Sequence, residues 1–153
     1  MNHNDVLRSV RYMIKANDAQ MVKVFALSGL TLSTAQVAGY LKKEEEAGFA
    51  QCPDTVMAHF LDGLVTHRRG RDDSRPPQPL ELPVTNNTVL KKLRVAFELK
   101  EDDLHAVLKS VNFPVSKPEL SALFRKVGHD NYRPCGDQLL RNFLKGLTLR
   151  VRG

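Results

Sequence analysis

Basic side chains near the end of the sequence are the residues with the clearest capacity for chemistry. Arg141, Lys145 and Arg152 stand four and seven residues apart in the segment DQLLRNFLKGLTLRVRG. If this segment is helical, the three side chains share one face, and a row of cations suits the phosphates of a nucleic acid. A solvated helix face explains the same pattern, so both interpretations remain open. Three preceding cations extend the row: Arg125, Lys126 and Arg133.

Two cysteines offer a second kind of chemistry. Cys52 and Cys135 each stand just before a predicted helix, and the N-terminus of a helix can lower the pKa of a thiol and make it a nucleophile. No histidine stands at the same distance from both cysteines to act as a base. A free cysteine is most often a small buried hydrophobe, and we favour this interpretation. We therefore expect no enzymatic activity.

The histidines and acidic residues lack the pattern of a metal site or an acid–base site. His129 lies near Cys135 in the sequence and His59 follows Cys52, but the second close pair of ligands that a zinc site needs is missing. The run KKEEEAG at 42–48 is best explained as a solvated helix end. We expect neither a metal nor another cofactor.

These residues belong to a unit that the chain contains twice. A shift of 83 residues aligns 4–70 with 87–153 without a gap, and fifteen of the 67 aligned positions are identical. The intervening RDDSRPPQPLELPVTN contains four prolines, which prevent a continuous helix. The predicted organisation is a first repeat at 1–70, a proline-rich linker at 71–86 and a second repeat at 87–153. The identical pairs include Asn4/Asn87, Arg11/Arg94, Cys52/Cys135, Asp54/Asp137, Gly63/Gly146 and Arg69/Arg152.

Apolar residues recur at helical spacing in both repeats, and no alternating strand pattern competes with them. Gly29 and Asn112 occupy the same aligned position after the second helix, as expected for a left-handed C-terminal turn. The tetrapeptide SKPE at 116–119 predicts a capping box. The fold class is therefore all-α, a tandem duplication of a four-helix unit. The predicted helices cover 4–15 and 87–98, then 18–28 and 102–111, and the last two in each repeat begin at Ser33 or Ser116 and at Asp54 or Asp137.

A unit of this size buries little apolar surface alone. We therefore expect the two repeats to pack together with pseudo-two-fold symmetry. Gly63 and Gly146 lie inside the apolar stripe of the fourth helix, although glycine costs about 1 kcal/mol there relative to alanine. Their position predicts the close approach of another helix.

The sequence also predicts two ion pairs inside the repeats. Arg11 and Arg94 lie on the apolar stripe of the first helix, and Asp54 and Asp137 begin the fourth helix. We expect each arginine to meet the aspartate of its own repeat, at a helix N-terminus whose dipole also favours a carboxylate. Capping of the helix by the aspartate alone is the alternative.

Charge and composition limit the partners. The 153 residues carry a formal net charge of +6, and this excess lies mainly in the second repeat, where 87–153 has a net +6 against +1 for 4–70. Such a field favours anionic partners without specifying which. The start of the chain lacks the pattern of a signal peptide, and no apolar run is long enough for a membrane span. We expect a cytoplasmic protein that does not contact membranes.

A helix-turn-helix is a further way to interpret the second and third helices, which are joined across GLTLS and NFPVS. Such a unit would place its third helix in the major groove of DNA. However, the turn is longer than usual, and Phe25 and Leu108 stand where a small residue normally lets the helices cross closely. The sequence therefore favours this motif only weakly.

The segments SVRYMIKANDAQMVKVFAL and VSKPELSALFRKVGHDNYRPCGDQLLRNFLKGL, together with the duplicated layout, resemble the YehS-like family of bacterial proteins, which is named for domain of unknown function 1456. The resemblance implies a bacterial protein with two copies of the domain and supplies no catalytic residues. We expect an interaction module that binds RNA, DNA or a nucleoprotein through the basic face of the second repeat. The alternative is a protein-binding or self-assembling module with an acidic protein partner.

Overall fold

The computed structural model describes residues 1–74, 76 and 78–153, and this part of the chain forms helices and no strand. The helices are α1 (His3–Ile14), α2 (Asp18–Leu27), α3 (Thr34–Leu41), α4 (Asp54–Arg69), α5 (Asn86–Ala96), α6 (Glu101–Lys109), α7 (Lys117–Leu123) and α8 (Asp137–Arg152). The all-α class and the four helices of each repeat are confirmed. Within the described residues, no helix combines the length and the apolar character of a membrane span.

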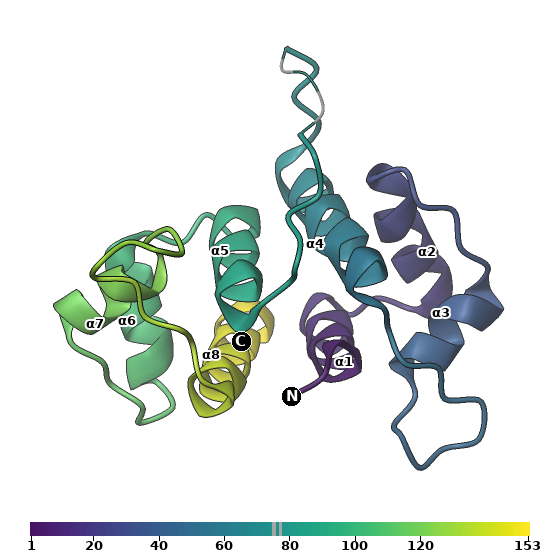
Figure 1. The fold of residues 1–153 in the computed structure, drawn as a ribbon. Coiled ribbons are helices and arrows are strands. Elements are labelled where there is room, and N and C mark those ends of the chain that lie inside the picture. Colours follow the sequence, from purple (N-terminus) through teal and green to yellow (C-terminus); the bar gives the residue numbers. More distant parts are fainter. Residues whose placement is uncertain (75, 77) are drawn as a thin grey trace.

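The two repeats pack together through the first and last helix of each. Helices α1, α4, α5 and α8 lie in the middle of the molecule, while α2 and α3 flank them on one side and α6 and α7 on the other (Figure 1). Helix α1 packs along α8, and α4 packs along α5. These two contacts exchange under the duplication, so the arrangement has the pseudo-two-fold symmetry that we expected. One hydrophobic cluster extends through both repeats.

Local sequence sets most of the helix ends. Gly29 and Asn112 have φ angles of +91° and +56°, which confirms the left-handed turns predicted after α2 and α6. Ser33 caps α3 in a complete capping box with Gln36. Ser116 likewise accepts the N–H of Glu119, but its hydroxyl also donates to the Glu119 carboxylate at 3.0 Å. The serine cap at α7 is confirmed, but the predicted capping box is incomplete, because Glu119 accepts the Ser116 hydroxyl and not its backbone N–H.

The glycines in the fourth helix of each repeat permit backbone-to-backbone packing. A Cβ atom at Gly63 would lie 2.0 Å from the carbonyl oxygen of Val24, and one at Gly146 would lie 2.3 Å from that of Val107. Helix α4 therefore rests directly on α2, and α8 rests directly on α6. The close approach predicted from the glycines is confirmed.

An asparagine in each repeat connects the loop before the last helix to the first helix. Asn4 is fully buried and donates to the carbonyls of Tyr40 and Ala50 at 2.9 and 2.8 Å, while its Oδ1 accepts the N–H of Cys52 at 3.0 Å. Asn87 makes the equivalent three bonds, with Leu123 O, Arg133 O and the Cys135 N–H at 2.9, 2.9 and 2.8 Å. The identity of this residue in both repeats thus has a structural reason.

The connector between the repeats packs against the body at its second end. It leaves α4 away from the rest of the molecule and returns beside α4 and α5 (Figure 1). Val84 is buried there, and Thr85 caps α5, which begins at Asn86 and so one residue before the predicted repeat boundary. The predicted linker at 71–86 therefore ends as part of the folded unit.

Candidate functional site

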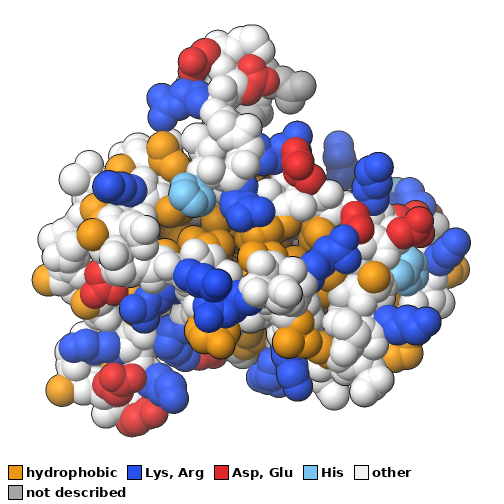
Figure 2. All heavy atoms as spheres, turned by 180° about the vertical axis from the view of Figure 1, so that it is seen from behind, with side chains coloured by type: hydrophobic (Ala, Val, Ile, Leu, Met, Phe, Trp, Pro, Cys, Tyr) orange, Lys and Arg blue, Asp and Glu red, His pale blue; other side chains and the backbone are white. Residues whose placement is uncertain are grey.

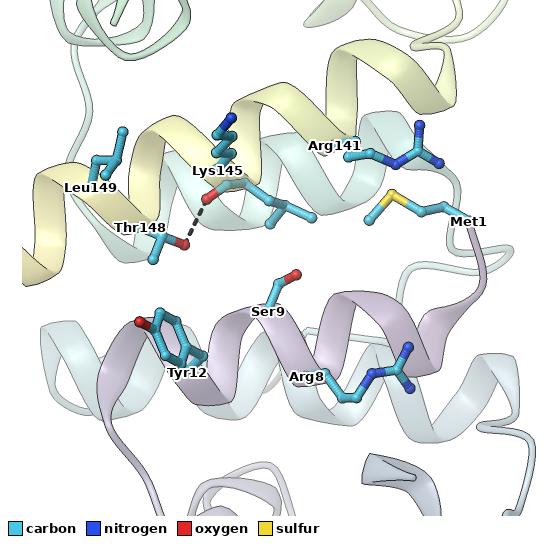
Figure 3. Close-up of a pocket in the computed structure, with 9 residues that line it drawn as sticks. Met1, Arg8, Ser9, Tyr12, Arg141, Lys145, Thr148 and Leu149 are labelled. Atoms are coloured by element: carbon cyan, nitrogen blue, oxygen red, sulfur yellow. Dashed lines mark hydrogen bonds between the residues drawn. The ribbon is translucent and has the colours of Figure 1, made fainter. Parts of the chain in front are cut away.

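A groove runs between the two repeats where α1 lies beside α8. Its cavity measures about 430 Å³. Met1 contacts Asp137 at the beginning of α8, and Tyr12 contacts Arg152 at its end, so the two helices run in the same direction. Figure 3 shows Arg8, Ser9 and Tyr12 on α1, with Arg141 and Lys145 on the facing helix. The groove is lined by Met1, Arg8, Ser9, Tyr12, Arg141, Leu144, Lys145, Thr148 and Leu149.

Two exposed cations in this groove form no close ion pair with the described residues. Neither Arg141 nor Lys145 has an acidic group within 4.0 Å among them. The Met1 amino group and, more weakly, Arg141 nevertheless lower the pKa of Asp137, which lies one helical turn before Arg141. The third cation, Arg8, is already engaged, because it pairs with Asp5 and donates to the carbonyl of Lys42 at 2.9 Å. The groove therefore carries two charges that an anionic ligand can neutralise.

At the equivalent helix pair, α4 and α5, the protein neutralises the corresponding charged position itself. There Lys92 and Asp62 form a salt bridge at 2.8 Å, and Glu81 of the connector lies 3.6 Å from Lys92. Under the duplication, Lys92 corresponds to Ser9 and Asp62 corresponds to Lys145. The α1/α8 groove thus has the uncharged Ser9 in place of the lysine and the positively charged Lys145 in place of the aspartate.

An aromatic side chain lies at the end of the α1/α8 groove. Tyr12 is 60% exposed, and the Arg152 guanidinium lies 4.0 Å from its ring centroid. Arg152 also donates to the Tyr12 carbonyl at 2.6 Å, and Arg69 makes the corresponding bond to Val95 at 3.5 Å. The identical arginines therefore connect the two repeats, and Arg152, which the sequence predicted as a phosphate contact, is engaged with Tyr12.

The surface around the junction of the repeats combines basic and apolar character. In the view of Figure 2, Lys and Arg side chains surround a hollow in the middle of the molecule, where hydrophobic side chains are visible. Leu149 adds apolar surface at the α1/α8 groove and is 55% exposed. A ligand at this junction would meet both positive charge and apolar surface.

Comparison with known proteins matches the two repeats to one family. Residues 3–70 and 86–153 each match the family described as "Protein of unknown function (DUF1456)". The chain belongs to this family. It is also 49% identical to the "Uncharacterized protein YehS" of Escherichia coli (strain K12) over 150 residues, which cover 98% of this chain and 96% of that relative. No solved structure gives a significant match.

The remaining predicted cations lie apart from the groove. Arg125 and Arg133 line a different cavity of about 600 Å³, formed by α7 and the loop that follows it. Arg133 pairs there with Glu119 at 2.9 Å, while Lys126 adjoins Arg125 in the sequence. The cations expected to form one basic face of the second repeat are thus divided between two cavities. Of these two, the α1/α8 groove is lined by residues of both repeats and contains Arg141 and Lys145.

The two ion pairs predicted inside the repeats are wrong. The Nε atom of Arg11 donates to the carbonyl of Ala16 at 3.1 Å, and that of Arg94 donates to the carbonyl of Leu99 at 3.1 Å. Each arginine therefore stabilises the turn after the first helix of its own repeat. The guanidinium of Arg94 also lies 4.7 Å from the ring centroid of Phe124.

Asp54 and Asp137, the aspartates predicted to form those pairs, instead form hydrogen bonds with the residues that precede the first helix of the other repeat. Asp54 accepts the N–H of Val84 at 3.1 and 3.0 Å, and His3 lies 2.8 Å from its Oδ1. Asp137 accepts from the Met1 amino group at 2.7 Å and from Asn86 at 2.8 Å. These hydrogen bonds, that of the Met1 amino group first, lower the pKa of Asp137. Val84 and Met1 are equivalent positions, so this tie occurs twice.

The cysteines are packing residues in this structure. Cys52 and Cys135 are buried, and burial raises the pKa of their thiols to about 12 and about 11, with a smaller contribution from the neighbouring Asp54 and Asp137. The lowered thiol pKa that a helix N-terminus can produce does not occur here. Within the described residues, no three His, Cys, Asp or Glu side chains are grouped as metal ligands.

Both thiols are expected to react slowly with iodoacetamide at pH 8 in the native protein. A thiol with a pKa of about 11 has a thiolate fraction on the order of 100-fold below that of a free cysteine. Alkylation followed by mass spectrometry should show both sites labelled rapidly in urea and very slowly without it. Rapid labelling of either cysteine in the folded protein would contradict the buried position.

Sequence reasoning missed the contributions of α1 to the groove. Ser9, Tyr12 and Arg8 were not predicted as site residues, since they lie more than a hundred residues from Arg141 in the chain. The alignment of the repeats did not single these positions out, because 52 of its 67 positions differ. Only the packing of α1 along α8 brings Ser9 and Tyr12 to Lys145.

Proposed function

We propose that the protein binds nucleic acid, without catalysing a reaction, through the α1/α8 groove. The observation that carries this proposal is the contrast between two equivalent helix pairs, α4/α5 and α1/α8. Between α4 and α5, Lys92 pairs with Asp62, whereas Arg141 and Lys145 in the α1/α8 groove form no ion pair within 4.0 Å in the described part of the chain. The α4/α5 pair folds with an internal ion pair at these positions, so the exposed charges are not required for folding.

Phosphate is the ligand chemistry that suits these two cations. One turn of α8 separates Arg141 from Lys145, so their Cα atoms are about 6 Å apart along the helix axis. Each can therefore contact a different phosphate of one chain. Phosphate contacts position a protein and do not distinguish bases, so we expect binding that is largely independent of sequence.

Replacing Arg141 and Lys145 together by glutamine is expected to weaken binding and its dependence on salt. The loss of two phosphate contacts should reduce the slope of log affinity against log salt by about 1.4 for single strands. Fluorescence anisotropy of labelled RNA and DNA oligonucleotides between 50 and 200 mM salt would measure this slope. Both side chains are exposed, so circular dichroism should show an unchanged fold.

A matched control removes the same charge elsewhere. Lys23 on α2 and Lys109 on α6 are exposed and lie on the flanking helices. Their double replacement by glutamine should leave the salt slope near the wild-type value. If the wild-type protein binds neither RNA nor DNA at low salt, the proposal is wrong, and an acidic protein partner for the basic groove becomes the explanation to test.

A further inference from the structure

We infer that the nucleic acid in the α1/α8 groove is single-stranded, with an unpaired base stacked on Tyr12 and the adjoining phosphates on Arg141 and Lys145. This inference rests on the proposed function and specifies its ligand. Proteins that bind single strands combine a basic groove with aromatic side chains on which bases stack. The groove contains both parts in a fixed order.

The order follows from the parallel course of the two helices. Met1 lies beside Asp137 and Tyr12 lies beside Arg152, so the groove runs from a cationic end at Arg141 to an aromatic end at Tyr12. Figure 3 shows these two residues at opposite ends of the groove. From Arg141 to Thr148, α8 rises about 10 Å. This length accommodates a few nucleotides of one strand along the groove.

The exposure of Tyr12 favours a stacking role. Its side chain is 60% exposed, although large aromatic side chains are normally well buried. The Arg152 guanidinium lies against the ring at 4.0 Å and also bonds to the Tyr12 backbone. This contact fixes the ring at the groove while much of it stays accessible. A fixed ring loses less conformational freedom when a base stacks on it.

The α4/α5 helix pair again provides the internal comparison. Val95 occupies the position equivalent to Tyr12, beside the neutralised pair Lys92 and Asp62. An aliphatic side chain offers no ring for stacking. The aromatic residue therefore occurs beside Arg141 and Lys145 in the α1/α8 groove, and the aliphatic one occurs beside the ion pair of α4 and α5. The polar hydroxyl of Ser9 lies between the two ends of the α1/α8 groove and can donate to a phosphate or sugar oxygen.

A duplex fits this arrangement poorly. Its bases are paired and stacked inside, so none can reach the ring of Tyr12 without being unpaired first. A duplex can still contact Arg141 and Lys145 through its phosphates. The structure therefore predicts a preference for single strands that depends on Tyr12, together with a salt dependence that depends on the cations.

The experiment compares a single-stranded ten-nucleotide RNA and DNA with duplexes of the same length. Tyr12→Val installs the side chain that the other repeat carries at this position, so the fold should accept it. We expect this variant to bind single strands about 5- to 150-fold more weakly, with duplex binding and the salt slope unchanged. Tyr12→Phe should retain the affinity because it keeps a ring.

Tyrosine fluorescence gives a second measurement. The chain has three tyrosines and no tryptophan, so stacking on Tyr12 should quench a measurable share of the emission. Addition of a single strand should quench the wild type, whereas Tyr12→Phe should bind with less quenching. Duplex binding equal to single-strand binding, or unchanged affinity of Tyr12→Val, would overturn the inference while the proposed function stands. Absence of all nucleic-acid binding overturns both.

Discussion

Replacing Gly63 by alanine is expected to destabilise the protein by about 1–3 kcal/mol. The new Cβ would lie 2.0 Å from the Val24 carbonyl oxygen, a distance that real atoms do not adopt, so α2 and α4 must move apart. Overpacking of this kind typically costs 1–3 kcal/mol or more. Alanine recovers about 1 kcal/mol of helix propensity, but the neighbouring atoms are backbone and cannot move alone.

Urea unfolding followed by circular dichroism would measure this loss. Gly136→Ala is the control, since a Cβ at that position meets no atom within 4 Å. Its midpoint should stay close to that of the wild type. Gly146→Ala should behave like Gly63→Ala, because its Cβ would lie 2.3 Å from the Val107 carbonyl oxygen. A wild-type midpoint for the two helix variants would show that the helices do not approach as closely as described.

Replacing Asn4 by alanine is expected to have a larger effect, about 3–5 kcal/mol. The change leaves the carbonyls of Tyr40 and Ala50 and the N–H of Cys52 without their partner in a fully buried position. Each unsatisfied buried group costs about 1–3 kcal/mol. Asn4→Asp should also destabilise strongly, because a carboxylate would face two carbonyl oxygens.

The corresponding change in the second repeat provides the comparison. Asn87 makes the same three bonds but is only partly buried, so water can replace some of them, and Asn87→Ala should cost less. Chemical denaturation of both variants gives the difference in unfolding free energy. Hydrogen exchange at the Cys52 amide should accelerate in Asn4→Ala. Equal stability of Asn4→Ala and the wild type would show that the three bonds contribute nothing.

Local features of the fold could be predicted because their causes lie within a few residues. The caps of α3 and α7 depend on Ser33 and Ser116 and on residues three positions later, and the turns after α2 and α6 depend on Gly29 and Asn112. The duplication was visible directly from the aligned repeats. The two glycines predicted a close contact, since glycine inside a helix needs a compensating reason, although the sequence did not name the partner helix.

The assignment of ionic partners failed for a physical reason. The spacing of apolar residues predicts which face of the first helix carries Arg11 and where the fourth helix begins at Asp54. It does not determine the direction of either side chain. The arginine instead binds the carbonyl of Ala16 in the turn after its own helix and lies 3.9 Å from the carboxylate of Asp18. Asp54 met Val84, which the packing of the other repeat brings to it. When several hydrogen-bonding groups lie within reach of a charged side chain, the tertiary structure decides which of them becomes its partner.

The amino-acid sequence by itself therefore determined the helices, their caps, the duplication and the presence of cations on α8, because each depends on short-range spacing. Only the tertiary structure decided which of these cations are available. It places Arg152 against Tyr12 and Arg133 against Glu119, and it leaves Arg141 and Lys145 beside α1. The reason is that charge neutralisation acts through space between helices that are distant in the chain.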